Sequence, residues 1–148
     1  MENQSYHAVL TVSQPANEAF NCINRVTKWW MENLEGNSEK LNDVFTVDFG
    51  AGNFVTHRLI EVIPDKKVAW LVTDCYLSWF KDKTEWTDTK MIFEISSGGD
   101  TTQISFTHLG LVPTIECYDM CVKGWDQYVK GSLFKLITDG EGQPQKKT

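Results

Sequence analysis

Residues 117–140, CYDMCVKGWDQYVKGSLFKLITDG, decide the fold that the sequence predicts. No proline interrupts the chain from Thr114 to about Asp139, and apolar side chains recur there every three or four residues, as on one face of an α-helix. These side chains are Cys117, Cys121, Trp125, Val129, Leu133, Leu136 and Ile137. At about 1.5 Å per residue, the predicted helix is roughly 35–40 Å long. A helix with one apolar face must bury that face against another layer of the protein.

Glycines interrupt this helix and end it. Gly124 and Gly131 each cost about 1 kcal/mol relative to alanine, and we expect them to allow a close approach to a sheet. Gly140 ends the helix, and we expect residues 143–148 to form a flexible tail. Residues 1–142 then form a single domain, which agrees with the size of a chain of 148 residues.

The segments before the helix alternate between apolar and polar residues, which is typical of β-strands. They are SYHAVLTV (5–12), DVFTVDF (43–49), NFVTHRLIEVI (53–63), VAWLVTDC (68–75), TKMIFEIS (89–96) and TTQISFTHL (101–109). Short turns rich in glycine or containing proline join the last five, except for a longer loop after residue 75, which predicts consecutive hairpins and therefore an antiparallel sheet.

Two short helices are predicted after the first strand. The first begins near Pro15 and has an apolar stripe of Ala16, Ala19, Phe20 and Ile23. The second begins near Thr27, carries two tryptophans, and leads into a polar loop, ENLEGNSEKLN, at residues 32–42. The predicted fold class is therefore α+β, with a curved antiparallel sheet wrapped around the long C-terminal helix.

Several local sequences occur in an order that matches a known superfamily. They are PANEAFNCI (15–23), KWW (28–30), LIEVIPDKKVAWLV (59–72), WTDTKMIFEI (86–95), TQISFTHLGL (102–111) and CVKGWDQYVKGSLFKLITDGEG (121–142). Together they resemble the START-like (SRPBCC) superfamily, which has the helix-grip fold, and within it the AHSA-type branch, relatives of activators of the heat-shock chaperone ATPase. The resemblance implies a deep, largely apolar cavity between sheet and helix. It does not fix the function, since this fold serves lipid carriers, receptors, polyketide cyclases and chaperone partners.

Strand parity predicts which side chains face that cavity, because side chains along a strand point alternately to its two faces. On the strand at 101–109 the apolar set ends in His108, while the strand at 53–63 leaves both faces open, so that Thr56 and Arg58 are candidates only if their face points inward. The predicted ligand-binding residues are His108, Phe106, Trp125, Tyr128, Trp70, Phe93, Met91, Cys121 and Phe45. For the large aromatic residues the alternative is plain core packing. For His108 the alternatives are a structural histidine, a polar anchor for a ligand, and an acid or base.

Charge and composition exclude some classes of partner. The net charge of -6 excludes nucleic acid, whose binding depends on Lys and Arg neutralising phosphates. No apolar stretch approaches the ~18 residues that a membrane span needs. The N-terminus, MENQSYHAVL, has no charged-then-apolar pattern of a secretory signal, so we expect a cytoplasmic protein with free thiols.

A metal site and a catalytic site are both weakly supported by the sequence. Cys117 and Cys121 lie one helical turn apart and His108 could be near them, but structural zinc takes four ligands and no fourth stands at a suitable spacing. No motif of a nucleophile elbow, zinc protease, phosphate loop or dinucleotide site is present. We therefore predict no metal, no cofactor and no catalytic residue.

The sequence thus predicts the non-catalytic binding of a small apolar or amphipathic ligand, a lipid among them, between sheet and helix. Two alternatives stay open. The resemblance to chaperone-ATPase activators implies a co-chaperone-like role with a heat-shock chaperone as the partner. A polyketide cyclase or dehydratase is the other alternative, with His108 as its acid or base.

Overall fold

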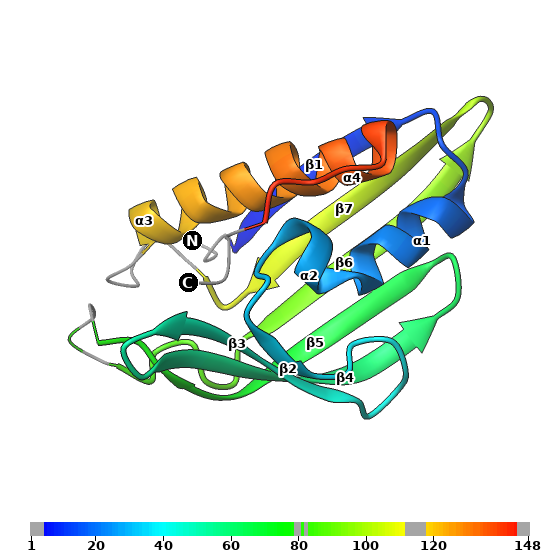
Figure 1. Ribbon diagram of the computed structural model, residues 1–148. Helices are drawn as coiled ribbons and strands as arrows, with labels where there is room; N and C mark the ends of the chain where they lie inside the picture. Colours follow the sequence, from blue (N-terminus) through cyan, green and yellow to red (C-terminus); the bar gives the residue numbers. More distant parts are fainter. Residues whose placement is uncertain (1–4, 79–80, 82, 112–117, 145–148) are drawn as a thin grey trace, which may run out of the picture.

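The computed structural model describes residues 5–78, 81, 83–111 and 118–144. Within these residues, seven strands form one antiparallel sheet with the order β1-β7-β6-β5-β4-β3-β2 (Figure 1). The strands are β1 (Tyr6–Val12), β2 (Leu34–Gly36), β3 (Val44–Gly50), β4 (Asn53–Ile63), β5 (Lys67–Tyr76), β6 (Lys90–Gly98) and β7 (Thr101–Leu109). The N-terminal strand therefore pairs with the last strand, and β2 forms the opposite edge.

The helices lie on one face of this sheet. They are α1 (Ala16–Asn24), α2 (Val26–Trp29), and the C-terminal helix made of α3 (Tyr118–Trp125), η1 (Asp126–Leu133) and α4 (Phe134–Asp139). Figure 1 shows the C-terminal helix running along the sheet beside β1 and β7, with α1 and α2 next to it. The expected α+β architecture, a curved sheet around a long C-terminal helix, is confirmed.

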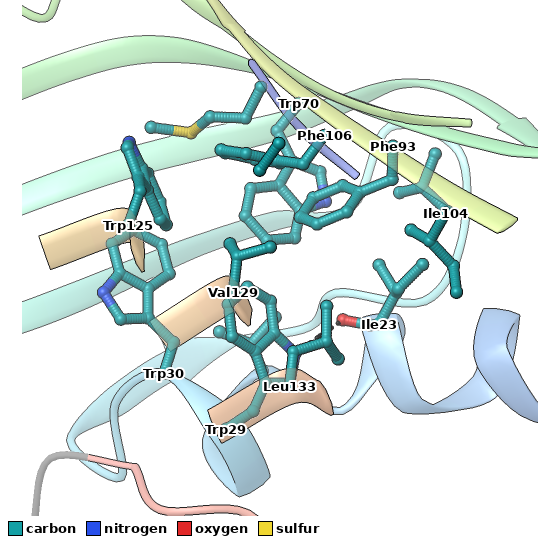
Figure 2. Close-up of a cluster of buried hydrophobic side chains, with 14 of the residues drawn as sticks. Ile23, Trp29, Trp30, Trp70, Phe93, Ile104, Phe106, Trp125, Val129 and Leu133 are labelled. Carbon is teal, nitrogen blue, oxygen red and sulfur yellow. Dashed lines mark hydrogen bonds between the residues drawn. The ribbon is translucent and has the colours of Figure 1, made fainter. Parts of the chain in front are cut away.

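The face of the sheet toward the helices carries the side chains that strand parity predicts. On β7 and β6, Ile104, Phe106, Met91 and Phe93 are completely buried. Trp70 of β5 joins them, and the C-terminal helix closes the cluster from the other side (Figure 2). At about 25 cal/mol per Å² of apolar area removed from water, burial of these large side chains is the main contribution to stability.

Strand β4 is the strand whose orientation the sequence left open. Val55, His57 and Leu59 are completely buried, whereas Arg58 is exposed. Thr56 lies on the outer face, where its Oγ1 is 2.8 Å from Oγ1 of Thr46 on the neighbouring strand. Neither Thr56 nor Arg58 therefore lines the interior, and the inward polar side chain of β4 is a histidine.

The C-terminal helix is not a regular α-helix, in contrast to the prediction. Its middle third, η1 (Asp126–Leu133), is a π-helix, in which backbone hydrogen bonds span five residues rather than four. The buried residues Cys121, Trp125, Val129, Leu133 and Ile137 recur every four residues. In an α-helix of 3.6 residues per turn, each such step rotates the side chain by about 40° beyond a full turn. The wider turn of η1 reverses this drift, so all five face the sheet.

Two further segments refine the sequence prediction. The prediction of a polar loop at residues 32–42 is wrong for Leu34–Gly36, because these residues form β2 and pair with β3. At the other end of the chain, the backbone N–H of Gln143 donates to Oγ of Ser132 at 2.6 Å. The flexibility expected of residues 143–148 stays a prediction, and residues 145–148 lie outside the described part.

Candidate functional site

An apolar pocket of about 140 Å³ opens beside the start of the C-terminal helix. Five segments that are distant in the sequence contribute to it: the residue after α2, the end of β3, the chain after β5, the chain before β6, and α3 with η1. The lining residues are Trp30, Phe49, Leu77, Trp86, Met120, Cys121, Gly124, Trp125 and Tyr128. Met120 is 60% exposed and forms the rim, whereas the inner residues Trp30 and Trp125 are only 2% exposed.

Three indoles form the inner wall of the pocket. The ring of Trp125 lies 5.0 Å from that of Trp30 and stacks on Trp86 at 6.0 Å. Figure 2 shows Trp30 and Trp125 next to each other at one end of the buried cluster. Such walls offer large apolar faces with few polar atoms, an arrangement typical of sites for small organic molecules.

His108 lies behind this wall and has hydrogen bonds at both ring nitrogens. The indole N–H of Trp125 donates to Nδ1 of His108 at 2.9 Å. Since Nδ1 accepts, Nε2 carries the proton and donates to Oγ1 of Thr89 at 2.8 Å. The Thr89 hydroxyl in turn donates to the carbonyl oxygen of Trp86 at 2.6 Å. Burial, with a smaller repulsion from His57, lowers the pKa of His108 to about 3, so its imidazole is neutral.

The hydrogen bonds of His108 tie together two walls of the pocket. Trp125 and Trp86 both line the pocket, and both are linked to the imidazole, the latter through Thr89. Neither ring nitrogen is left for a substrate. The geometry therefore favours a structural and positioning role for His108 over that of an acid or base.

His57 is a second completely buried imidazole, and its nitrogens are not satisfied. Its ring stacks on Phe45 at 4.5 Å and meets the edges of Trp30 and Trp70 at 5.4 and 5.5 Å. Among the described residues, neither nitrogen has a partner with hydrogen-bond geometry. Burial lowers the pKa of His57 to about 3, and the nearby backbone of Phe45 offsets only part of this effect.

The structure divides the predicted ligand-binding residues into two groups. Trp125, Tyr128 and Cys121 line the pocket. The others are buried in the cluster behind it and do not line it; they are His108, Phe106, Trp70, Phe93, Met91 and Phe45. The space between sheet and helix, where the resemblance implied a deep cavity, is thus largely occupied by aromatic side chains. The role of all nine residues in ligand binding stays a prediction.

Most residues of the pocket wall were not among the predicted ligand-binding residues. Trp30, Leu77, Trp86 and Met120 stand outside the strands or outside the apolar stripe of the helix, so no periodicity marked them. Phe49 belongs to the inward apolar set that alternation predicts on β3, but it was not among the predicted ligand-binding residues. The signal that was available is the number of tryptophans in the turns and connections of this chain.

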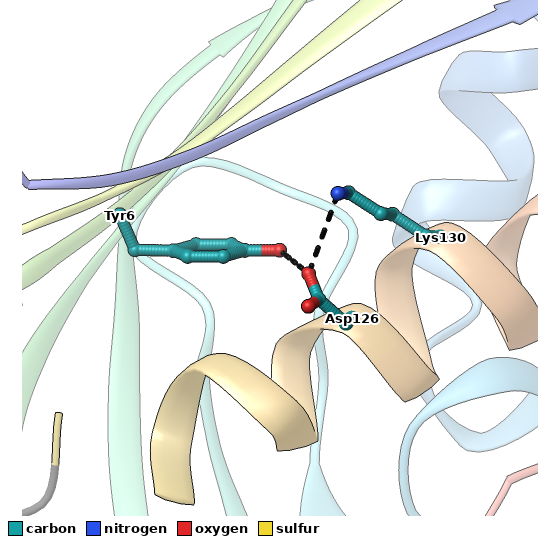
Figure 3. A network of polar contacts seen from close by, with 3 residues as sticks. All are labelled: Tyr6, Asp126 and Lys130. Atoms are coloured by element: carbon teal, nitrogen blue, oxygen red, sulfur yellow. Dashed lines mark hydrogen bonds and ion pairs between the residues drawn. The ribbon is translucent and has the colours of Figure 1, made fainter. Parts of the chain in front are cut away.

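A polar contact joins the edge strand β1 to the C-terminal helix. Oη of Tyr6 donates to Oδ1 of Asp126 at 2.5 Å, and Nζ of Lys130 lies 3.6 Å from the same oxygen (Figure 3). Burial, and next the hydrogen bond with Asp126, raise the pKa of Tyr6 well above its usual range. This contact lies at the first turn of η1 and holds the end of the helix that carries the pocket.

Among the described residues, no group of three or more His, Cys, Asp or Glu side chains lies together. Cys117, which the sequence places one helical turn before Cys121, lies outside the described part of the chain. A second hollow, of about 470 Å³, lies between α2 and the chain after α4, and charged side chains such as Arg25, Lys28 and Glu141 line it. Among the helices that the structure describes, none is long and apolar enough to cross a membrane.

Comparisons with known proteins find solved structures of similar architecture but no related sequence. No family model matches the sequence, and no curated protein matches it either. The solution structure of the Aha1 dimer from Colwellia psychrerythraea matches with a TM-score of 0.73 at 19% identity, over 96% of this chain and 100% of that one. Protein CV1439 from Chromobacterium violaceum matches with a TM-score of 0.68 at 16% identity, over 90% and 96% of the two chains.

A third similar structure is DynU16, a protein in the dynemicin biosynthetic locus. It matches with a TM-score of 0.68 at 16% identity, over 95% of this chain and 49% of that one, so this chain spans about half of DynU16. Identities this low establish a shared fold and nothing finer. The sheet order, the C-terminal helix and these neighbours together show that the chain has the helix-grip fold.

Proposed function

We propose that the protein binds a small apolar molecule, without chemical change, in the pocket beside the start of the C-terminal helix. The observation that carries the proposal is the pocket itself, whose wall is almost entirely aromatic and aliphatic. In an otherwise densely packed interior, an open apolar hollow loses van der Waals contacts that a ligand would restore.

The volume of the pocket limits the ligand. Whole-ligand pockets usually measure roughly 300–1,000 Å³, whereas an engineered cavity of about 150 Å³ in another protein holds benzene. A pocket of about 140 Å³ therefore fits one ring or a short alkyl chain. A larger amphipathic molecule would leave its polar part at the rim near Met120 and Tyr128.

Toluene binding tests this proposal, with two glycines of the C-terminal helix as a matched pair. Gly124 lines the pocket and a Cβ built there meets no atom within 4 Å, so the side chain of Gly124→Leu starts without a clash and competes with a ligand for the pocket. Gly131→Leu places the same side chain on the same helix, away from the pocket. We expect ligand-observed NMR to show toluene binding to the wild type and to Gly131→Leu, and its loss in Gly124→Leu. Equal binding by both variants, or none by the wild type, would contradict the proposal.

The protein as purified from its own host supplies a second test. Native mass spectrometry followed by extraction would identify a molecule that the pocket carries. A compound with one apolar ring or short chain inside the pocket agrees with the proposal.

A co-chaperone-like interaction is the second candidate, because the Aha1 structure matches over its whole length. It predicts that titration with this protein changes the ATPase rate of the host's heat-shock chaperone, and that Gly124→Leu does not abolish the change. An unchanged ATPase rate would remove this candidate. No comparable observation favours a cyclase, since both nitrogens of His108 are already engaged.

A further inference from the structure

His57 is a buried polar group whose ring nitrogens meet hydrogen-bond geometry with no described residue, although the backbone of Phe45 lies close enough to raise its pKa slightly. Its side chain is 0% exposed, and neither ring nitrogen has a partner among the residues described. An unsatisfied buried group is costly, so its presence in a folded protein requires an explanation. The same core satisfies His108 at both nitrogens, which shows that this fold can pair a buried imidazole. Because His108 is paired and His57 is not, we look for the partner of His57 outside the described chain.

One side chain separates His57 from the apolar pocket. The indole of Trp30 lines the pocket on one side, and its ring lies 5.4 Å from the imidazole of His57 on the other. Trp70, whose ring is 5.5 Å from His57, adds a second buried group, since its Nε1 also lacks a partner in the described part of the chain. Three unpaired polar atoms therefore lie behind the inner wall of the pocket.

The indole of Trp30 is held by ring contacts alone. It lies parallel to the ring of Trp70 at 6.1 Å, with an interplanar angle of 3°. By contrast, the indole N–H of Trp29 donates to the carbonyl of Ile23, and that of Trp125 donates to His108. No hydrogen bond from a described residue holds the Trp30 side chain, and Trp30 follows a helix of only 4 residues. Turning this indole aside breaks ring contacts but no hydrogen bond to a described residue.

We propose that a ligand displaces the Trp30 indole, extends the pocket to the sheet, and hydrogen-bonds His57 through a hydroxyl group. The inference rests on the proposed function and names the class of ligand, a neutral planar aromatic alcohol with two fused rings. The present pocket holds one ring, and the space of one indole accommodates the second. The rings of Phe45 and Trp70 supply apolar surfaces beside the polar atoms.

The chemistry of His57 specifies a hydroxyl over a charged group. A neutral imidazole offers one donor and one acceptor, and a hydroxyl can pair with either. The lowered pKa of His57 keeps the ring neutral at physiological pH, so an anionic ligand would find no positive charge there. A ligand hydroxyl would also remove the cost of the unsatisfied nitrogens, which adds to the affinity.

The test compares 2-naphthol with 2-methylnaphthalene, which differ only in a hydroxyl and a methyl group. His57→Leu should weaken 2-naphthol binding about tenfold, because it removes one buried hydrogen bond, and should leave 2-methylnaphthalene binding unchanged. Isothermal titration calorimetry measures both, and circular dichroism checks that the variant is folded. No change in either affinity, or an equal loss in both, would overturn the role of His57.

Trp30→Ala tests the displacement. Since this variant has no indole to move, we expect both two-ring probes to bind more tightly and to associate faster than with the wild type. Weaker binding of both would show that Trp30 is a fixed wall and would overturn the displacement. Toluene needs no displacement, so toluene binding without 2-naphthol binding overturns this inference alone. Failure of toluene as well overturns the proposed function.

Discussion

The indole N–H of Trp125 and Nδ1 of His108 form a hydrogen bond of 2.9 Å between the C-terminal helix and the last strand of the sheet. The bond fixes the tautomer of the imidazole and the orientation of a pocket wall at once. It also links the two parts of the protein that the helix-grip fold brings together, the helix and the sheet.

The two buried histidines should respond in opposite ways to the same substitution. His108→Leu leaves the Trp125 N–H buried without an acceptor and should lower the free energy of unfolding by about 1–3 kcal/mol. His57→Leu removes no hydrogen bond of good geometry to a described residue and should leave stability unchanged or raise it. Urea unfolding of both variants at pH 7 measures the difference. A loss of similar size in both would mean that His57 has a partner in solution.

Acid should destabilise the protein through these two imidazoles. A histidine in the unfolded chain has a pKa near 6.5, whereas both buried rings have a pKa of about 3. Between these values the unfolded state binds more protons, so the free energy of unfolding falls as the pH is lowered from 6.5 toward 3. Two such groups give a slope of up to about 2.7 kcal/mol per pH unit.

Carboxylates also titrate in the lower part of this range, so the comparison with His57→Leu isolates the histidine effect. This variant should show about half of the histidine slope between pH 6.5 and 5, measured by urea unfolding at each pH. The same slope in the variant and the wild type would mean that His57 is protonated in the folded state.

The contact between Tyr6 and Asp126 should contribute measurably to stability. Tyr6→Phe removes a hydrogen bond between a buried hydroxyl and a carboxylate, and should cost about 1–2 kcal/mol. Lys130→Gln removes only the exposed ion pair to the same carboxylate and should cost less than about 0.5 kcal/mol. Thermal unfolding of the two variants gives this ranking, and the reverse order would contradict it.

Gly36 is required by the backbone of β2. Its φ is +104°, and a Cβ built there would lie 2.2 Å from the carbonyl oxygen of Val44. Gly36→Ala should therefore destabilise the protein by at least about 2 kcal/mol. Gly98→Ala is the control, since a Cβ at Gly98 meets no atom within 4 Å. Differential scanning calorimetry should show a lowered melting temperature for the first variant only.

The sheet was predictable from the sequence because its period of two is clear on five strands, β1 among them. The inward sets on β1, β3, β5, β6 and β7 follow from alternation alone, which requires only that apolar side chains avoid water. Strand β4 was not predictable in this way, because apolar and polar residues occur on both of its faces. Register irregularities at Thr56/His57 and at Leu59/Glu61 further obscure its period. The polar residue of greatest interest, His57, was therefore overlooked.

The sequence contains a signal for the π-helix, although the apolar spacing was interpreted as a regular α-helix. Five apolar residues exactly four apart from Cys121 to Ile137 cannot all share one face of a regular α-helix, because the stripe rotates by about 40° at each step. The pocket had no such signal. Its walls come from loops and chain ends, whose positions depend on tertiary packing rather than on periodicity.

The parallel, neighbouring rings of Trp30 and Trp70 have an optical consequence. Indoles packed this closely share electronic excitation, so their near-ultraviolet circular dichroism depends on their mutual orientation. Any molecule that rotates one of them will change that spectrum. The protein thus carries an unlabelled reporter of whether its interior is occupied.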